Sequence, residues 1–411
     1  MDAKDLQVRC LHVNSEKEAL DCLRGGWGDP SSIEYIVSKM GHVNILVETV
    51  ECGVANILKQ EMLSVGGDAA VAHDKAGCSG AKTDVILLGT LKQVRCLAEN
   101  IRLRPFGLRD VAREIDLLSN RISSESHVFK TSRREIILGK RTLIMGILNV
   151  TPDSFSDGGK FAAPDEAVEA GIQMKEEGAD IIDVGGESTR PGSDRVPPAE
   201  EVRRIVPVIR GLASRIDIPL SIDTTKELVA RAALAEGAEI VNDISSMNFD
   251  EQMASLIAET RAATIFMHMR GTPKTMQNGD LSYRSLWSDV IAFLRGRIKL
   301  ATEVGIDPLS IMVDPGLGFG KSAEDNLRLL HDLPELKVLG KPILTGPSRK
   351  SFIGRFIGGN PQQRIEGTSA AVTAAIMNGC HVIRVHDVGI MKKVAAMADA
   401  LTRPYLATES E

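Results

Sequence analysis

The sequence predicts a (β/α)8 barrel preceded by a smaller α/β domain. Beyond residue 133, eight short apolar runs alternate with helical patterns. These runs are almost continuously apolar, which is typical of parallel strands that helices cover on both faces. The region from residue 133 to residue 411 is also close in length to the roughly 250 residues that such a barrel occupies. An open, doubly wound sheet is the alternative that the same alternation allows.

The predicted strands follow one another in order, and each is followed by a helical segment that can connect it to a parallel neighbour. They occupy residues 142–150, 179–189, 218–224, 238–245, 263–269, 311–316, 341–348 and 381–388. Closure into a barrel places the carboxyl ends of all eight strands on one rim, which is where barrels of this kind bind their substrates.

Groups that hydrogen-bond or carry charge end every one of these runs. They are Asn149, Asp183, Glu187, Asp223, Asn242, Asp243, His268, Asp314, Ser348, Arg349, Lys350, Arg384, His386 and Asp387. Helix capping is an alternative role for Asp223, Asp243 and Ser348, because Asp and Ser are preferred at helix starts. Capping does not explain an Arg-x-His at the end of one run and a Ser-Arg-Lys at the end of another. We therefore expect an active site on this rim.

The chain before the barrel is predicted to be a small α/β domain over residues 1–118. Its short apolar runs occupy residues 43–47, 69–72 and 85–88, and helical patterns separate them. A stretch rich in serine and charge, residues 119–132, is predicted to be the linker to a domain of residues 133–411. No motif gives the small domain an activity. Contacts between copies, contact with a neighbouring pathway enzyme, and cover for one end of the barrel remain open roles.

Composition and charge favour a cytoplasmic enzyme. The net charge of −6 and the isoelectric point near 5.9 provide no basic excess for binding nucleic acid or an anionic membrane. The six cysteines form no CxxC pair and no zinc-type spacing, which fits a reduced compartment. No stretch of about 18 apolar residues could span a bilayer, and the first residues lack a signal-peptide pattern. We expect small-molecule substrates and no nucleic-acid or membrane partner.

The first barrel strand leads into a loop of unusual composition. Asn149 ends the strand, a Thr-Pro turn follows, and Asp153, Phe155 and Asp157 then alternate with serines before paired glycines. A loop without a function rarely combines two carboxylates, an aromatic ring and conformationally free glycines. We interpret this loop as a mobile lid over the barrel mouth. A Phe155 ring anchored in a neighbouring crevice is the alternative.

Nine successive motifs are similar to those of the dihydropteroate synthase family. They are GILNVTPDSFSDGG, DVGGESTRPGS, SIDT, IVNDIS, MHMRGTPKTMQ, DPGLGFGKS, GPSRKSFIG, GTSAAV and VIRVHDV. The first motif and the segment ESTRPG are specific, whereas SIDT or GTSAA alone would be weak. The resemblance spans residue 133 to about residue 400, so it says nothing about the chain before it.

The resemblance implies a transferase of folate biosynthesis that is a target of sulfonamides. In that family, 6-hydroxymethyl-7,8-dihydropterin diphosphate condenses with p-aminobenzoate to give 7,8-dihydropteroate and diphosphate. The pterin-binding positions of the family correspond to Asp223, Asn242, Asp314, Lys350 and Arg384. Carboxylates suit the N–H groups of the pterin edge, and Lys350 suits its ring oxygen and nitrogen. Turn initiation before Pro315 is the alternative for Asp314.

The resemblance also implies a site for the diphosphate, and fixed cations there would stabilise the charge that grows on the leaving group. The matching residues are Asn149, Thr189, Arg190, Arg384 and His386. Magnesium usually accompanies such anions with few protein ligands, and the oxygen of Asn149 is the expected one. A core histidine bonded to a backbone carbonyl is the alternative for His386.

The remaining implied roles concern the second substrate and catalysis. The p-aminobenzoate walls correspond to Phe155, Pro191, Phe319 and Ser351. Asp153 and Asp157 would stabilise the positive pterin methylene, and Arg190 and Lys350 complete the expected catalytic set. The family also implies a homodimer through barrel helices. A pterin-binding methyltransferase and a non-catalytic pterin-binding protein are the alternatives. Neither of them needs the lid loop, the loop that carries Arg190 and the Arg-x-His motif together.

Overall fold

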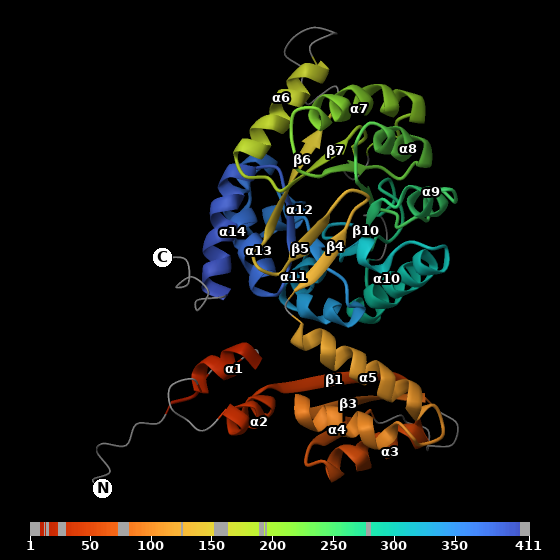
Figure 1. Cartoon of the computed structure of the whole chain (residues 1–411), viewed down its shortest axis with the longest axis vertical. Coiled ribbons are helices and arrows are strands. Elements are labelled where there is room, and N and C mark those ends of the chain that lie inside the picture. Colours follow the sequence, from red (N-terminus) through yellow and green to blue (C-terminus); the bar gives the residue numbers. More distant parts are fainter. Residues whose placement is uncertain are drawn as a thin grey trace, which may run out of the picture. The chain divides into compact units, whose positions relative to one another are not determined.

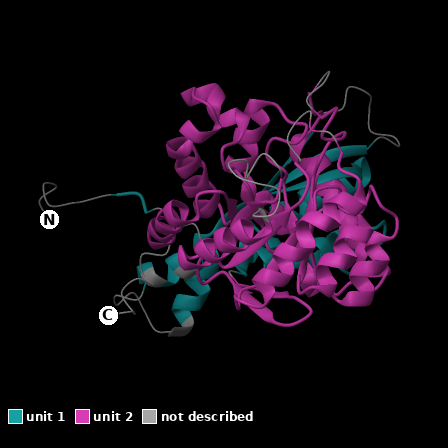
Figure 2. Cartoon of the chain, turned by 90° about the horizontal axis from the view of Figure 1, so that it is seen from above, with its two compact units in different colours: residues 1–125 teal, residues 126–411 magenta. Residues whose placement is uncertain are grey.

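The computed structural model divides the chain into two compact units, Met1–Glu125 and Ser126–Glu411 (Figure 2). It describes residues 9–11, 13, 16–23, 30–72, 82–124, 126–151, 163–188, 193, 195–276 and 281–402. Within these ranges, no helix combines the length and the hydropathy that a membrane-spanning segment needs.

The N-terminal unit contains a three-stranded antiparallel sheet in the order β1-β3-β2 (Figure 1). Its strands are β1 (His42–Glu51), β2 (Asp68–Val71) and β3 (Lys82–Thr90), and its helices are α1 (Glu16–Leu23), α2 (Pro30–Met40), α3 (Cys52–Ser64), α4 (Leu91–Ile101) and α5 (Leu108–Ser123). Alternate residues of β3 are buried, so that one face of the strand joins the core. Thr90 begins α4 through a reciprocal capping box with Gln93.

The C-terminal unit is a closed parallel barrel, which confirms the predicted fold class. Its strands are β6 (Leu143–Asn149), β7 (Ile181–Gly185), β8 (Leu220–Asp223), β9 (Ile240–Asp243), β10 (Ala263–Met267), β11 (Ile311–Asp314), β12 (Leu344–Thr345) and β13 (Val382–Val385). They pair in the order β11-β10-β9-β8-β7-β6-β13-β12. A parallel bridge between Val313 and Ile343 joins β11 to the segment before β12, and this bridge closes the barrel.

Helices surround the strands of the barrel (Figure 1). They are α6 (Ala163–Glu176), α7 (Pro198–Ala213), α8 (Glu227–Ala235), α9 (Met253–Thr260), α10 (Leu286–Glu303), α11 (Ala323–His331), α12 (Ser351–Ile357), α13 (Ile365–Met377) and α14 (Val388–Thr402), with short 3-10 helices at Pro308–Ser310, Leu333–Leu339 and Pro361–Gln363. Apolar residues of the strands and helices form one continuous core between the two layers. The carboxyl ends of the parallel strands meet at one rim, and the loops that lead from the strands to the helices begin there.

A hairpin of β4 (His127–Lys130) and β5 (Glu135–Leu138) begins inside the predicted linker and ends in the predicted barrel domain. Phe129 and Leu138 are buried in the cluster that also contains Leu143 and Met145 from the barrel interior. Thr131 donates to a carboxylate oxygen of Glu239 at 2.7 Å.

The prediction of a linker over residues 119–132 is therefore wrong at both of its ends. Its first residues are the last turn of α5, and its last residues belong to the hairpin. The division between the two compact units falls at residue 125, inside the predicted linker. The hairpin was missed because His127, Lys130 and Glu135 interrupt its apolar residues within a stretch rich in serine and charge, so neither strand shows a continuous apolar run.

Candidate active site

A buried network of charges lies at the carboxyl ends of β7, β8 and β13. Arg384 donates from Nε to Oδ2 of Asp183 at 2.6 Å and from Nη2 to Oδ2 of Asp223 at 2.7 Å. Both carboxylates are almost completely buried, and the remaining oxygen of each has no hydrogen-bond partner among the described residues. Because unpaired buried carboxylate oxygens are costly, this network is suited to accept hydrogen bonds from a ligand.

Asn242 joins the same network from β9. Its Nδ2 donates to Oδ2 of Asp183 at 2.8 Å, and its side chain is buried. Two side chains from the sequence-predicted set, Asn242 and Arg384, thus meet at one oxygen of Asp183. The sequence placed Asp183 on the rim but assigned it no role.

Burial changes the titration of the two predicted pterin carboxyls. It raises the pKa of Asp223 to about 7, against the opposing effect of the Arg384 charge, while Asp183, Glu201 and Asp243 raise it further. Burial likewise raises the pKa of Asp314 to about 6. Perturbed carboxyls that gather in a concave place are typical of functional sites.

Lys350 follows β12, the strand that pairs with β13, and lies directly before α12. Its Nζ is 4.2 Å from the centre of the Phe319 ring, and its side-chain carbons pass close to Gly318. Burial and the charge of Arg384 lower the pKa of Lys350 to about 8. Ser351 is the first residue of α12 and is exposed. The structure therefore brings together Lys350, expected at the pterin, and Phe319, expected at the p-aminobenzoate.

A second lysine, Lys321, is buried beneath this region. Its Nζ bonds to Nδ1 of His268 at 2.9 Å and donates to the backbone oxygens of His268 and Phe319. Burial lowers the pKa of His268 well below its usual range and that of Lys321 to about 7. These hydrogen bonds hold the end of β10 against the loop that carries Phe319.

The Arg-x-His and Ser-Arg-Lys motifs contact each other. Nδ1 of His386 is 2.9 Å from the hydroxyl oxygen of Ser348, and Arg349 forms a two-point ion pair with Asp387. Arg349 has a left-handed backbone, with φ of 58°. The ion pair helps to hold this unfavourable conformation in place. Nδ1 of His386 is therefore bonded to a side chain of the rim. This bond is not to a backbone carbonyl, as the alternative of a core histidine would require.

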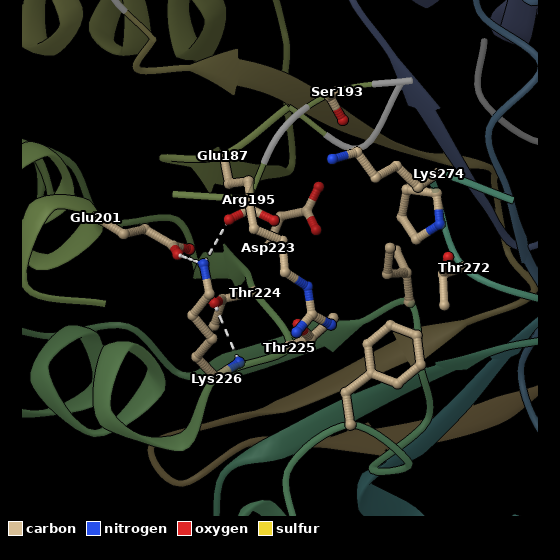
Figure 3. A pocket seen from close by; sticks show the side chains of 13 residues that line it. Glu187, Ser193, Arg195, Glu201, Asp223, Thr224, Thr225, Lys226, Thr272 and Lys274 are labelled. Atoms are coloured by element: carbon tan, nitrogen blue, oxygen red, sulfur yellow. Dashed lines mark hydrogen bonds and ion pairs between the residues drawn. The ribbon is translucent and has the colours of Figure 1, made fainter. Parts of the chain in front are cut away.

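A cavity of about 230 Å³ opens beside Asp223 (Figure 3). Asp223 at the end of β8, Glu201 of α7 and residues of the segments that follow β7, β8, β9 and β10 line it, namely Glu187, Ser193, Arg195, Glu201, Asp223, Thr224, Thr225, Lys226, Ile244, Phe249, Thr272, Pro273 and Lys274. Lys226 donates to the carboxylates of Glu187 and Glu201 and, at 2.8 Å, to the backbone oxygen of Val196. Lys226 thus connects the turn after β8 to both ends of the β7–α7 loop.

Asn149 ends β6 next to this network. A Cβ atom added to Gly185 would lie 3.9 Å from Oδ1 of Asn149 and 3.6 Å from Cβ of Asp223, so all three residues are neighbours. The described ranges contain no group of three His, Cys, Asp or Glu side chains that could hold a metal ion. One protein oxygen fits Mg²⁺ only where water and phosphate oxygens supply its other ligands.

Several predicted residues lie outside the described part of the chain. They are Asp153, Phe155, Asp157, Thr189, Arg190 and Pro191. Their roles stay predictions.

Sequence reasoning missed four contributors to the site. Asp183 was placed on the rim without a role, although its position two residues after Ile181 indicated that it faces the barrel interior, because alternate strand residues do so. Ile244 and Met267 pack with Phe319 in one apolar cluster at the strand ends. Met267 lies near the end of a predicted strand, and this position could have indicated that it contributes to the site. The bonds of Lys226 cross 25 and 39 residues and had no local signal.

Known proteins resemble the C-terminal unit closely. The chain matches the family described as pterin binding enzyme over residues 145–386. It is 48% identical over 266 residues to the dihydropteroate synthase of Synechocystis sp., and the match covers 64% of this chain and 92% of the relative. A dihydropteroate synthase of Xanthomonas albilineans solved with 4-aminobenzoic acid is 42% identical, with a TM-score of 0.62, over 67% of this chain and 98% of that one.

One further relative extends the similarity towards the N-terminus. It is a probable bifunctional folylpolyglutamate synthase/dihydropteroate synthase of Halobacterium salinarum, 39% identical over 377 residues. The match covers 92% of this chain and 45% of the relative. Because so little of the chain is left uncovered, the match must include most of the N-terminal unit.

Proposed function

The chain belongs to the pterin binding enzyme family and, within it, to the dihydropteroate synthases. On this basis we propose which of its residues bind each substrate and which assist the reaction. In this reaction, 6-hydroxymethyl-7,8-dihydropterin diphosphate condenses with p-aminobenzoate to 7,8-dihydropteroate. The C–O bond to the diphosphate breaks, with its electron pair leaving on oxygen. A C–N bond forms between the pterin methylene and the aryl amine, which loses a proton.

The buried carboxylates of the rim are the observation that carries the proposed pterin site. Asp223 and Asp314 are both less than a tenth exposed, and no group in the described part of the chain bonds to Oδ1 of Asp223. A pterin edge offers N–H donors that would satisfy such oxygens. A ligand without those donors would leave the oxygens unpaired, which supports discrimination by roughly 10⁴-fold.

Cationic donors complete the proposed pterin site. Lys350 serves the ring oxygen and nitrogen of the pterin, and Arg384 lies beside Asp223. Ile244 and Met267 contribute an apolar wall, and they pack in one cluster with Phe319. This combination of apolar walls with a few placed polar groups is typical of small-molecule sites.

The diphosphate is assigned to Asn149, Thr189, Arg190, Arg384 and His386. Support comes from Asn149 and Arg384, which both lie close to Asp223 at the rim. Asn149 would hold Mg²⁺ through its side-chain oxygen, and the ion would neutralise part of the diphosphate charge. The fixed positive charges of the protein would stabilise the leaving group as its negative charge grows.

The aryl amine is assigned to Phe155, Pro191, Phe319 and Ser351. Phe319 is supported by its ring, which lies 4.2 Å from Nζ of Lys350, and Ser351 by its place directly after Lys350 in the chain. Asp153 and Asp157 would stabilise positive charge on the pterin methylene, while Arg190 and Lys350 assist the departure of diphosphate. These carboxylates would act only during bond breaking, so their main effect is expected on turnover.

A homodimer through barrel helices is the proposed assembly. Large apolar side chains are exposed on three helices of the C-terminal unit, namely Phe356 and Ile357 on α12, Met377 on α13 and Met397 on α14, each at 53% or more. Exposed apolar groups on adjacent elements often mark an interface. Sedimentation equilibrium should give twice the chain mass, and a monomer at micromolar concentration would contradict this assembly.

An assay of diphosphate release tests the proposed function directly. The purified protein should release diphosphate only when both dihydropterin diphosphate and p-aminobenzoate are present, with dihydropteroate formed in equal amount. Methyl transfer from a methylated folate would instead support the methyltransferase. Pterin binding without release of diphosphate would support the non-catalytic alternative.

A further inference from the structure

We propose that Asp183 is a positioning residue that sets which end of the Asn242 amide faces the pterin. The inference rests on the proposed function, because it takes Asn242 as a pterin ligand. Asp183 itself is the middle residue of β7 and is fully buried.

The contact between the two side chains crosses the barrel interior. Strand β8 lies between β7 and β9 in the sheet, so the carboxylate of Asp183 reaches past one whole strand to meet Asn242. The Asn242 amide approaches Oδ2 of Asp183 at 2.8 Å, and Arg384 holds the same oxygen at 2.6 Å. As a carboxylate paired with Arg384, Asp183 can only accept hydrogen bonds.

An acceptor-only partner decides the direction of an asparagine amide. If Asn242 rotated by half a turn, its carbonyl oxygen would lie against Oδ2 of Asp183, and two acceptors would meet without a proton in a buried place. Such an unsatisfied buried contact is costly. The amide nitrogen must therefore face Asp183, and the carbonyl oxygen must face away from it.

This direction determines what the ligand meets. Oδ1 of Asn242 is left as an acceptor, in addition to the carboxylates of Asp223 and Asp314, which end the strands β8 and β11. Three acceptors from three strands suit an edge that is rich in N–H donors. An amide free to rotate would present a donor for part of the time, and the affinity for that edge would fall accordingly.

Three variants and a double-mutant cycle separate amide orientation from general support of the fold. Asp183→Leu removes the acceptor, whereas Asp183→Asn keeps a carbonyl oxygen in reach of Asn242. Asn242→Ala removes the group that Asp183 is proposed to direct. The matched control is Asp180→Asn, because Asp180 precedes the same strand and forms an ion pair with Arg141 outside the site.

Titration calorimetry with dihydropterin diphosphate, without aryl amine, measures each affinity. Asp183→Leu should weaken binding about 30-fold or more, and Asp183→Asn should remain within about fivefold of the parent protein, as expected when a buried acceptor is removed or kept. In the Asn242→Ala background, the loss from Asp183→Leu should shrink below about threefold, because coupled residues are not additive. The Asp180→Asn control should leave the affinity unchanged.

Two outcomes would overturn the proposal. If Asp183→Leu costs as much in the Asn242→Ala background as in the parent protein, Asp183 acts through Arg384 or the fold. If Asp183→Asn is as weak as Asp183→Leu, the negative charge matters and the acceptor does not. Failure of the parent protein to bind the pterin at all would instead refute the proposed function. Thermal unfolding identifies any variant that does not fold. If Asp183→Leu does not fold, the pterin affinity of Asp183→Asn relative to the parent protein decides the proposal.

Discussion

Arg384 donates to Asp223 at 2.7 Å although 161 residues separate them in the chain. The same guanidinium holds Asp183, so one side chain from the last strand of the barrel connects two carboxylates from the second and third strands. A buried cation shared in this way lowers the cost of placing both acids side by side. Among the described residues, nothing bonds to the second oxygen of either carboxylate, which can therefore accept from another donor.

Asp223→Asn should keep the fold and reduce the affinity for dihydropterin diphosphate by more than tenfold. The substitution replaces an acceptor by a mixed donor and acceptor, and it removes one charge from the pair with Arg384. Calorimetry measures the loss. Asp217→Asn is the control, because this exposed residue precedes the same strand and its carboxylate pairs with Lys175 at the surface. Unchanged affinity in Asp223→Asn would remove this residue from the site.

Pterin binding should strengthen as pH rises from about 5 to about 8. Burial raises the pKa of Asp314 to about 6 and that of Asp223 to about 7, and N–H donors of the ligand favour the ionised form of both. Binding should therefore release protons, measurable by calorimetry in two buffers of different ionisation enthalpy. Without ligand, the raised pKa values stabilise the fold below about pH 4, and that contribution is lost as pH rises through 6 and 7. A flat profile would contradict the assignment.

Asp153→Ala and Phe155→Ala should lower turnover much more than they weaken pterin binding. Their proposed roles begin only after the pterin is bound, so a loss in kcat without a matching loss in pterin affinity is expected. Steady-state kinetics combined with pterin titration separates the two effects. If both variants abolish pterin binding and leave turnover of bound substrate intact, the interpretation of this loop is wrong.

The barrel unit should retain synthase activity when expressed as residues 126–411. Residues 133–411, the predicted domain, should be less stable, because this shorter piece lacks the fully buried Phe129 and the bond from Thr131 to Glu239. Loss of a buried phenylalanine costs about 3–5 kcal/mol, equivalent to a fall in Tm of about 10 °C in a protein of this size. Calorimetric melting of both pieces measures the difference. A folded but inactive longer piece would show that the N-terminal unit completes the active site.

Lys226→Met should destabilise the barrel by about 3 kcal/mol near neutral pH, because it leaves two poorly exposed carboxylates without their shared cation. Burial already raises the pKa of Glu201, so the difference from the parent protein should shrink as pH falls and this group becomes protonated. Urea unfolding at several pH values measures this difference in unfolding free energy. Lys175→Met, at an exposed pair, is the control. Equal losses of unfolding free energy in both variants would show that Lys226 stabilises the barrel no more than an exposed lysine does.

The eight strands were predictable because their signal is local. Each apolar run is long enough to show that both of its faces are covered, and each ends in a polar group at the rim. The short hairpin of β4 and β5 gave no such signal. Phe129 is buried because the interior of the barrel receives it, and that interior exists only after eight distant strands have closed.

The sequence by itself determined the barrel, its order of strands and the residue types gathered at its rim. Only the tertiary structure decided which of them touch. Asp183 meets Asn242 across 59 residues and Arg384 across 201, and Lys226 meets Glu201 across 25. The physical reason is that periodicity and capping act within a few residues of the chain, whereas hydrogen bonds and ion pairs depend on distances that only the closed barrel sets.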